Sequence, residues 1–451
     1  MAGGQGKIKG WCGGLGLWLL ILVAWAPAGQ AGEVYVLPLQ GAVGPAMADF
    51  FVRTLEEAED AQADLLLVTL DTPGGLDTSM RRMIQAILAA RIPVAVYVYP
   101  QGARAASAGT YLLYSAHIAA MAPATNLGAA TPVELGGGGS PLPGGEGDNG
   151  ESPPKDGLTK MERKQINDAV AYIRGLAELR GRNAAWAEKA VREAASLSAD
   201  KALQNNVIDV IATDVKDLLA QLDGKTIALG ERTVTLDLAD ASLVEVQPDA
   251  RQQFLALITD PSVAYILMLI GIYGIIFEFY NPGLGIPGIL GAICLLTGLY
   301  AMQLLPVNYA GLALIVLGLA LMVGEAFVPS FGAMGIGGAV AFVVGSVMLM
   351  DTDVPAFQIA WPVIGALAVS SFLMMFMVLK MALRSRRQAV VSGQEALVGA
   401  EAIAMQDFET TGHVHVQGEI WKAVSNQPVK KQQRLRVTAV DGLTLHVEAQ
   451  T

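Results

Sequence analysis

A long, nearly uncharged stretch restricts what this chain can form more than any other feature of its sequence. From Pro261 to Met350 the only charged residues are Glu278 and Glu325, and there is no lysine or arginine. A membrane-spanning helix needs about 20 apolar residues, so the region from 261 to 383 has room for about five. We expect these helices near residues 262–280, 284–304, 310–327, 334–350 and 361–383.

The sequences that flank this region predict its orientation. Lys7 and Lys9 precede the apolar run Leu15–Trp25, and small residues up to Ala31 fit a cleavage site, so residues 1–31 are typical of a signal peptide. An uncleaved anchor helix is the alternative. The cluster Arg384–Arg387 follows the last expected helix and marks the cytoplasmic side. An odd number of spans, five, then joins an extracytoplasmic N-terminal domain to a cytoplasmic C-terminus. We expect a multi-pass protein of a bacterial-type plasma (inner) membrane.

Composition excludes several other classes of protein. Hydrophobic residues make up 53% of the chain, charged residues only 16%, and the net charge is −11, which argues against nucleic acid as a partner. The two cysteines, Cys12 and Cys294, cannot build a disulfide framework. The four histidines show no metal-ligand spacing, so we expect neither a metal nor a cofactor.

Residues 32–246 have the alternating pattern of an α/β domain. Short apolar runs at 34–37, 65–70, 94–98 and 207–211 predict strands, and helical periodicity covers 46–58, 79–90, 161–180 and 184–194. Residues 134–156 are rich in glycine, proline and serine and predict a mobile surface loop within this domain.

The last segment, residues 390–451, predicts a small β-barrel of the OB type. Gly412–Gly418, Arg434–Val440 and Leu443–Val447 alternate like strands, and Asp441-Gly442 is a hairpin turn signal. OB folds often bind single-stranded nucleic acid. Residues 389–451 carry 5 basic and 7 acidic residues, which favours a protein-contact module.

The apolar region contains an internal repeat. Residues 278–291 match residues 325–338, each copy with an acid, a proline break and glycines on one helix face. Such glycines allow close helix packing, so we interpret the repeat as a duplicated helix pair with a tight turn. A functional acid within the membrane is the alternative.

Two motifs in the α/β domain carry the candidate chemistry. Asp71–Gly75 (DTPGG) directly follows a strand and leaves bare backbone N–H groups that can stabilise an oxyanion. Ala105–Tyr111 (AASAGTY) places Ser107 at the start of a helix, where developing negative charge is favoured. A nucleophilic serine needs a base. Lys160 and Lys164 share one helix face, and the residues alone leave both open.

These motifs resemble the ClpP/crotonase superfamily, and nearly the whole chain resembles the long form of the NfeD family. The resemblance is carried by DTPGG (71–75), GARAASAGTYL (102–112), MAPATNLGAATP (121–132) and the stretch from Lys164 to Asn183. It implies a ClpP-like serine protease domain, a helical membrane region (261–383) and a C-terminal OB-fold domain. It also implies a Ser–Lys dyad, with Ser107 as nucleophile, Lys164 as base, and the N–H groups of Gly75 and Ala108 as the oxyanion hole.

The histidine of ClpP has no counterpart here, because the equivalent strand carries Gly128-Ala129-Ala130, so we expect His117 to be structural. A lysine accepts a proton only when it is neutral, so we expect an apolar pocket around Lys164. We also expect Asp168 to point away from it.

The resemblance further implies an endopeptidase that cleaves apolar segments of membrane-associated proteins. The implied substrate or partner is a stomatin/prohibitin-like (SPFH) protein, beside membrane lipid and further copies of the chain in a homo-oligomer. A non-catalytic membrane scaffold for such a partner is the alternative. An intramembrane protease using Ser346 is excluded, because the first four expected spans contain no histidine or lysine.

Overall fold

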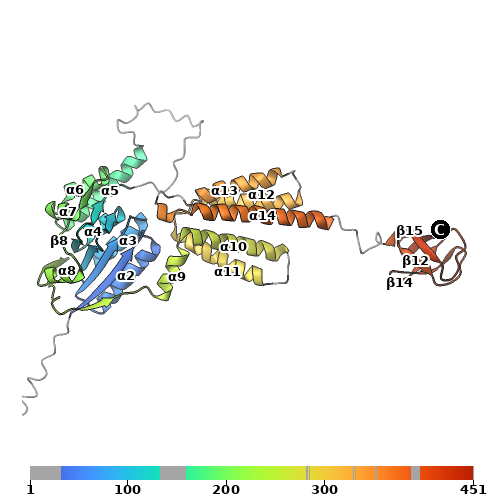
Figure 1. Ribbon diagram of the computed structural model, residues 1–451, viewed down its shortest axis with the longest axis horizontal. Helices are drawn as coiled ribbons and strands as arrows, with labels where there is room; N and C mark the ends of the chain where they lie inside the picture. Colours follow the sequence, from blue (N-terminus) through green and yellow to red (C-terminus); the bar gives the residue numbers. More distant parts are fainter. Residues whose placement is uncertain are drawn as a thin grey trace, which may run out of the picture. The chain divides into compact units, whose positions relative to one another are not determined.

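The computed structural model describes residues 32–132, 159–280, 285–328, 332–350, 354–386 and 397–449, together with residues 283, 330 and 352. The predicted signal peptide (1–31) and the predicted surface loop (134–156) lie outside the described residues. An α/β domain, a series of apolar helices and a β-barrel follow one another along the chain (Figure 1).

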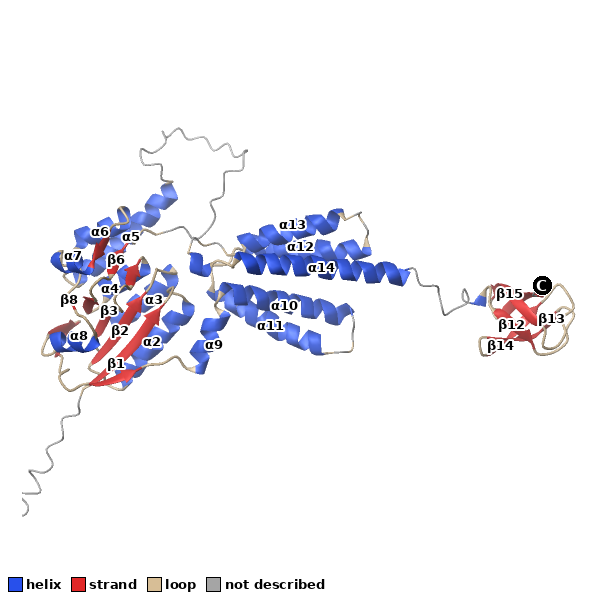
Figure 2. Cartoon of the chain, viewed as in Figure 1, coloured by secondary structure: helices blue, strands red, loops and turns tan. Residues whose placement is uncertain are grey.

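The α/β domain is built on a six-stranded parallel sheet (Figure 2). The strand order is β11-β1-β2-β3-β5-β8. The strands are Glu33–Gln40 (β1), Leu65–Asp71 (β2), Val94–Val98 (β3), Ile118–Met121 (β5), Val210–Ile211 (β8) and Ser242–Glu245 (β11). Both faces of a parallel sheet are covered, which explains the continuous apolar runs. The predicted strand at 207–211 is shorter than expected, because Val207 and Ile208 are buried in the core before strand pairing begins.

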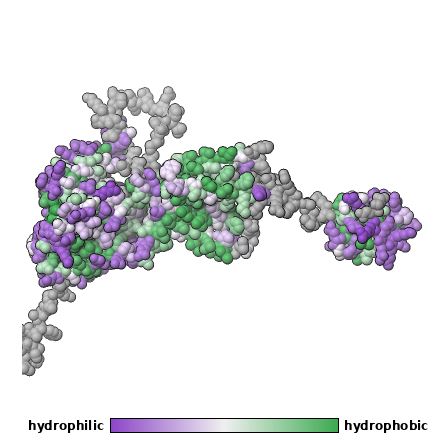
Figure 3. Space-filling model, viewed as in Figure 1, coloured by the Kyte–Doolittle hydropathy of each residue, from purple (hydrophilic) through white to green (hydrophobic). Residues whose placement is uncertain are grey.

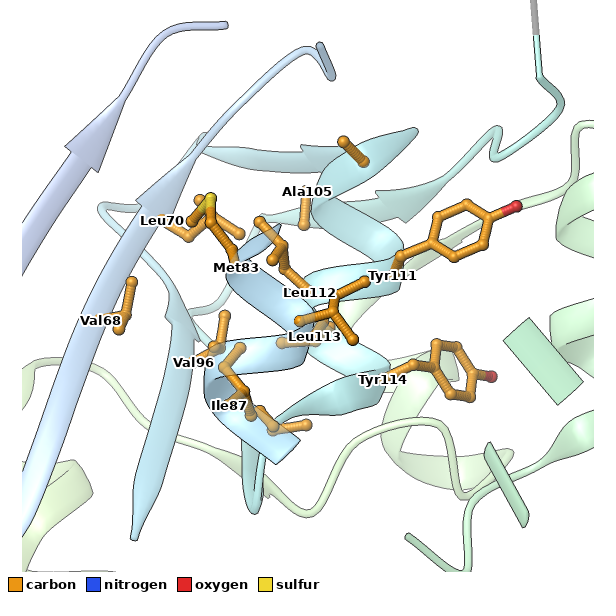
Figure 4. Close-up of a cluster of buried hydrophobic side chains, with 14 of the residues drawn as sticks. Val68, Leu70, Met83, Ile87, Val96, Ala105, Tyr111, Leu112, Leu113 and Tyr114 are labelled. Atoms are coloured by element: carbon orange, nitrogen blue, oxygen red, sulfur yellow. The ribbon is translucent and has the colours of Figure 1, made fainter. Parts of the chain in front are cut away.

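Helices cover both faces of this sheet. They are Pro45–Asp60 (α2), Asp77–Ala89 (α3), Ala108–Ser115 (α4), Lys160–Leu179 (α5), Ala184–Arg192 (α6), Ala199–Gln204 (α7) and Val215–Leu222 (α8). Alternate residues of β2 serve two cores: Val68 and Leu70 pack with residues of α2 to α7, whereas Leu67 packs with residues of α8. Figure 4 shows Val68 and Leu70 in the first core. The predicted α/β alternation is therefore confirmed.

A second, small sheet brings the two chemical motifs together. It consists of Arg104–Ala106 (β4), Asn126–Gly128 (β6) and Ser196–Ser198 (β7). Thr72, just after β2, forms an isolated parallel bridge with Ala105 of β4. The residues that precede Ser107 therefore lie beside the DTPGG segment. Farther along the chain, Thr226–Leu229 (β9) and Arg232–Thr235 (β10) form a two-stranded sheet, and Ala250–Ile258 is helix α9.

The apolar region forms helices close to the five predicted bounds. They are Pro261–Tyr280 (α10), Ile286–Leu304 (α11), Tyr309–Phe327 (α12), Ala333–Met348 (α13) and Trp361–Arg386 (α14), with a short 3₁₀ helix at Pro355–Phe357 (η1). Among the described residues, three segments are long and apolar enough to span a membrane, and α12 and α13 are shorter apolar helices. Apolar side chains dominate the surface of this region (Figure 3). Five spans therefore stay a prediction.

The internal repeat forms two helix hairpins of the same design. The Glu278 carboxylate accepts hydrogen bonds from the backbone N–H groups of the residues five, seven and ten positions further along the chain. Glu325 does the same at the same three offsets. The first N–H groups of a helix lack partners within the helix. The acid at the end of one helix therefore caps the start of the next, as expected for a duplicated pair.

Glycines close the two hairpins at matching positions. A Cβ on Gly298 would stand 2.9 Å from the backbone nitrogen of Met268 on the partner helix, and one on Gly345 would stand 2.7 Å from the backbone of both Gly311 and Ile315. Each helix backbone thus approaches its partner closely, as small residues permit in membrane helices.

The C-terminal segment forms a closed five-stranded barrel, as predicted. Its strands are Glu401–Ala404 (β12), Thr411–Val416 (β13), Glu419–Val424 (β14), Arg434–Asp441 (β15) and Thr444–Ala449 (β16), in the order β12-β13-β14-β16-β15. Alternate residues such as Val414 and Val416 fill its core. The hairpin at Asp441-Gly442 joins β15 to β16 in antiparallel pairing, with Gly442 at φ +58°.

Candidate active site

Ser107 has an unusual backbone conformation at the junction of β4 and α4. Its φ and ψ are 49° and −111°, a region that L-residues rarely adopt. Its N–H donates to the Gly128 carbonyl at 3.0 Å, and its own carbonyl accepts the N–H of Thr110 at 2.9 Å. The Ser107 side chain makes no capping bond to α4. The local fold thus holds this residue in a strained conformation, as is common at functional sites.

Gly74 and Gly75 pass Ser107 at close range. A Cβ on Gly74 would stand 2.7 Å from the Cβ of Ser107, and Gly74 has a φ of +119°. The Gly74 carbonyl accepts the N–H of Val43, and the N–H of Leu76 donates to the Val43 carbonyl, both at 2.8 Å. The Gly75 N–H has no hydrogen-bond acceptor among the described residues. The Pro-Gly-Gly turn therefore brings bare backbone against the serine, as its sequence predicted.

Ser107 opens into a cavity of about 240 Å³, which Gly75 and Ala108 also line. Ala108 is the first residue of α4, so its N–H is one of those that a helix leaves without an internal partner. Three of the four predicted site residues thus share one cavity, with two backbone donors near the serine.

Lys164, the fourth predicted site residue, is exposed on α5 and is not among the residues that line the cavity. The expected apolar pocket around its amine is therefore absent from the described part of the chain. Gln165 and Asp168 on the same helix do line the cavity. Because residues four apart share a helix face, Lys164 lies one turn from the cavity wall. Lys160, one turn earlier, is exposed as well.

Arg81, which no motif in the sequence marked as a site residue, joins three helices at the wall of the cavity. Its guanidinium donates to Asp77 at 2.8 Å and to Asp168 at 2.9 Å. It also lies 4.4 Å from the ring centroid of Tyr172, and Tyr172 stacks on Tyr111 of α4 at 6.1 Å. Asp168, which we expected to point away from Lys164, thus pairs its charge with Arg81. The i,i+4 spacing of Asp77 and Arg81 was the only signal in the sequence.

Tyr111 also lines the cavity, and its hydroxyl group donates to the Ala130 carbonyl at 3.3 Å. Burial raises the pKa of this hydroxyl, so it stays protonated at neutral pH and is a poor base.

Arg182 fixes the other end of the helix that Ser107 begins. Its Nη1 donates to the carbonyls of Leu113, Tyr114 and Ala116, at the end of α4, and its Nη2 forms an ion pair with Asp209 at 2.6 Å. The Arg182 side chain is 2% exposed. A cation at a helix C-terminus satisfies the last carbonyls and the helix dipole. The Gly181-Arg182-Asn183 motif therefore holds α4 in place.

His117 lies outside the cavity lining. Its Nδ1 accepts the N–H of Val94 at 3.2 Å. Burial, followed by the charges of Arg180 and Arg182, lowers the pKa of the imidazole to about 3. A neutral ring that accepts a backbone hydrogen bond fits the structural role that we expected.

Ser346, which the sequence excludes as a nucleophile, is buried between apolar helices. Its hydroxyl group donates to the Phe342 carbonyl at 2.6 Å and lies 2.5 Å from the hydroxyl of Tyr265. Its hydrogen-bonding capacity is thus used within the helices.

Family models match all three parts of the chain. Residues 33–231 match "NfeD1b, N-terminal domain", residues 262–380 match "NfeD integral membrane domain", and residues 394–448 match "NfeD-like C-terminal, partner-binding domain".

Two relatives share substantial sequence with this chain. Membrane-bound protease PH1510 of Pyrococcus horikoshii is 34% identical over 447 residues, which are 96% of this chain and 97% of that protein. Membrane protein NfeD1b of Bacillus subtilis is 30% identical over 300 residues, 65% of this chain and 62% of that protein.

Solved structures similar to this chain cover its N-terminal and C-terminal parts. A lysine-to-alanine variant of the 1510-N membrane-bound stomatin-specific protease, in complex with a substrate peptide, is 34% identical with a TM-score of 0.44. It covers 51% of this chain and 99% of that one. The C-terminal domain of stomatin operon partner protein 1510-C, also from P. horikoshii, is 34% identical with a TM-score of 0.13. It covers 13% of this chain and 97% of that one.

The α/β domain, the apolar helices and the barrel define a multi-pass membrane protein whose sequence has one domain before and one domain after the membrane region. The chain belongs to the NfeD family, with the family's N-terminal, membrane and C-terminal domains, and is a homologue of a membrane-bound protease.

Proposed function

We propose that this protein is a membrane-anchored serine endopeptidase of the ClpP class. The observation that carries the proposal is the strained backbone of Ser107, which lies against Gly74 of the DTPGG turn and lines one cavity together with Gly75. Homology over 96% of the chain to a protein named a membrane-bound protease supports the same reaction class.

The proposed mechanism uses Ser107 as nucleophile and Lys164 as base. Neutral Lys164 Nζ takes the proton of Ser107 Oγ while Oγ bonds to the scissile carbonyl carbon. The N–H groups of Gly75 and Ala108 stabilise the resulting oxyanion. The C–N bond then breaks, and the lysine ammonium returns its proton to the leaving amine. Water then gives a proton to Lys164 as its oxygen bonds to the ester carbon. The bond from that carbon to Ser107 Oγ breaks, the lysine ammonium returns the proton to Oγ, and the product with the new carboxyl group leaves.

In this proposal Lys164 reaches the site when a substrate covers the cavity. Residues Gln165 and Asp168 already line the cavity, and the flexible side chain of Lys164 begins one turn away on the same helix. Bound substrate would exclude water from the amine and favour its neutral form.

We further propose that the protease domain (32–246) lies outside the cytoplasm, that residues 261–383 cross the membrane five times, and that residues 390–451 lie in the cytoplasm. The substrate or partner would be a stomatin-like membrane protein with an apolar cleavage segment, because the homologous structure is named a stomatin-specific protease. The C-terminal domain, whose family model is described as partner-binding, would contact this partner, and several copies of the chain would assemble.

A non-catalytic scaffold for a stomatin-like partner is the second candidate function. The exposure of Lys164 outside the cavity favours it, because a serine without a base is a weak nucleophile.

The full chain in detergent should distinguish the two functions. A fluorophosphonate should label Ser107, and Ser107→Ala should abolish both labelling and cleavage of a stomatin-like substrate. Lys164→Arg should be as inactive as Lys164→Ala, since a guanidinium stays charged, and Lys160→Ala should stay active. Full cleavage by the Ser107→Ala variant would disprove the proposed serine protease function.

A further inference from the structure

Helix α9 lies where the α/β domain meets the membrane region in the sequence. It covers Ala250–Ile258, ends with a cap at Thr259, and is followed by α10 from Pro261. The 20 residues of α10 rise about 30 Å, which equals the thickness of the hydrocarbon core. If α10 spans the membrane, all of its residues are needed to cross the hydrocarbon core. Pro261 then stands at the membrane surface, and α9 lies beside the lipid headgroups.

One face of α9 is anchored to the α/β domain. The Asp249 carboxylate caps the helix and accepts a hydrogen bond from Arg53 of α2 at 3.3 Å. Gln252 and Ile258 are only 7% and 2% exposed. The helix therefore has a defined rotation, which fixes the side chains that face outward.

The outward face carries two large apolar side chains. Phe254 and Leu257 are 55% and 58% exposed and stand one turn apart, at i and i+3. The side chain of Arg251, on the first turn of α9, is 66% exposed and lies 3.9 Å from the Asp49 carboxylate of α2. Helices that lie in a membrane interface combine apolar side chains on one face with flanking cations that meet anionic lipid.

We propose that α9 is an interfacial helix whose Phe254 and Leu257 side chains insert into the lipid at the boundary between headgroups and acyl chains. Only Thr259 and Asp260 separate α9 from α10, and this short connection favours lipid as the occupant of the outward face over a second protein. The inserted helix, anchored to α2, ties the α/β domain to the bilayer surface. This role of α9 is independent of Ser107 and Lys164.

Lipid quenching in proteoliposomes tests this arrangement. The full chain with Cys12→Ser and Cys294→Ser would receive one cysteine, Phe254→Cys or Leu257→Cys, labelled with an NBD fluorophore. Ala220→Cys, exposed on α8 of the same domain, is the matched control. We expect nitroxide lipids spin-labelled near the top of the acyl chain to quench the two α9 labels at least threefold more than the control label.

The emission of the α9 labels should also shift to the blue in liposomes relative to the control. Equal quenching at all three positions would overturn the proposal. So would unquenched α9 labels combined with disulfide formation between Leu257→Cys copies, because that result would place a second chain on this face.

Discussion

The guanidinium of Arg81 donates to the carboxylate of Asp168 at 2.9 Å, and this bond connects α3 to α5 one helical turn beyond Lys164. Both residues line the cavity that holds Ser107. In a Ser–Lys mechanism the distance between the two side chains depends on how α5 is held, because Ser107 and Lys164 come from different helices. The Arg81 contacts are therefore suited to position the proposed base.

Replacing Arg81 should reduce activity more than stability. Arg81→Met removes the bonds to Asp77 and Asp168, so we expect kcat to fall about tenfold with KM nearly unchanged, since misplacing a catalytic group raises the barrier. The pair is partly exposed, and such pairs contribute at most about 1 kcal/mol to stability. Kinetics and thermal unfolding of the full chain provide the check.

Arg82→Met is the matched control, because Arg82 is on the same helix, bonds weakly to Asp49 at 3.5 Å and does not line the cavity. An equal loss of kcat in both variants would contradict the positioning role.

The backbone of Ser107 predicts a conflict between stability and function. At φ 49° and ψ −111° a glycine is not strained, so Ser107→Gly should raise the free energy of unfolding by about 1 kcal/mol. Ser107→Ala keeps the strain and should unfold like the wild type. Both should lack activity. Denaturant unfolding compares the three proteins, and a Ser107→Gly variant less stable than Ser107→Ala would argue against stored strain.

Activity should require a glycine at position 74 because of its close contact with Ser107, and not only because of its positive φ. Gly74→Ala places a Cβ 2.7 Å from Ser107 Cβ, which must displace the nucleophile. A displacement near 1 Å can cost about 100-fold in rate. Gly102→Ala is the control, because Gly102 also has a positive φ, +86°, but no atom lies within 4 Å of the added Cβ. Similar activity in the two variants would remove the steric explanation.

The elements that the sequence predicted best are those with a strong local period. The continuous apolar run of β3 and the alternating pattern of β13 needed no information beyond a few residues. The carboxylate caps of the hairpins were visible as an acid, a proline and glycines at fixed spacing. The cavity that joins Ser107 to Gly75 followed from two motifs placed after neighbouring strands of one sheet.

The features that the sequence could not supply depend on contacts between distant residues. Arg81 and Asp168 are 87 residues apart, and no local pattern pairs them. The exposure of Lys164 depends on how α5 packs, which helical periodicity does not specify. The strain at Ser107 is imposed by β4 and β6, which pair across a connection that the motif does not contain.

His117 should make the domain sensitive to acid. A histidine in the unfolded chain has a pKa near 6.5, whereas burial lowers that of His117 to about 3 in the folded state. Between these values the unfolded state binds the proton. The full contribution of His117 to the free energy of unfolding is thus present above about pH 6.5. This free energy then declines by about 1.4 kcal/mol per pH unit as pH falls toward about 3.

His117→Asn should flatten this part of the profile, because an amide oxygen can accept the Val94 N–H without titrating in this range. The difference between the two unfolding curves from pH 7 to pH 4 isolates the histidine. If the two unfolding curves were parallel over this pH range, protonation of His117 would not reduce the free energy of unfolding.

The two hairpin caps differ in strength, and their removal should show it. Glu325 is 3% exposed and accepts the Ser330 hydroxyl at 2.6 Å and three N–H groups at 2.9 to 3.2 Å. The bonds of Glu278 are longer, from 3.1 to 3.4 Å. Hydrogen bonds to a charged acceptor stabilise more than neutral ones, and a buried donor left without a partner costs about 1–3 kcal/mol.

We therefore expect Glu325→Ala to reduce the free energy of unfolding by about 2–3 kcal/mol and Glu278→Ala by about 1 kcal/mol. Glu325→Gln keeps one oxygen acceptor, so its loss should be intermediate. Unfolding of the full chain in mixed detergent micelles, followed by circular dichroism, measures all three. If Glu325→Gln unfolded like the wild type but lost activity, the carboxylate would act through its charge in function and not as a cap, and the alternative interpretation of the repeat would be correct.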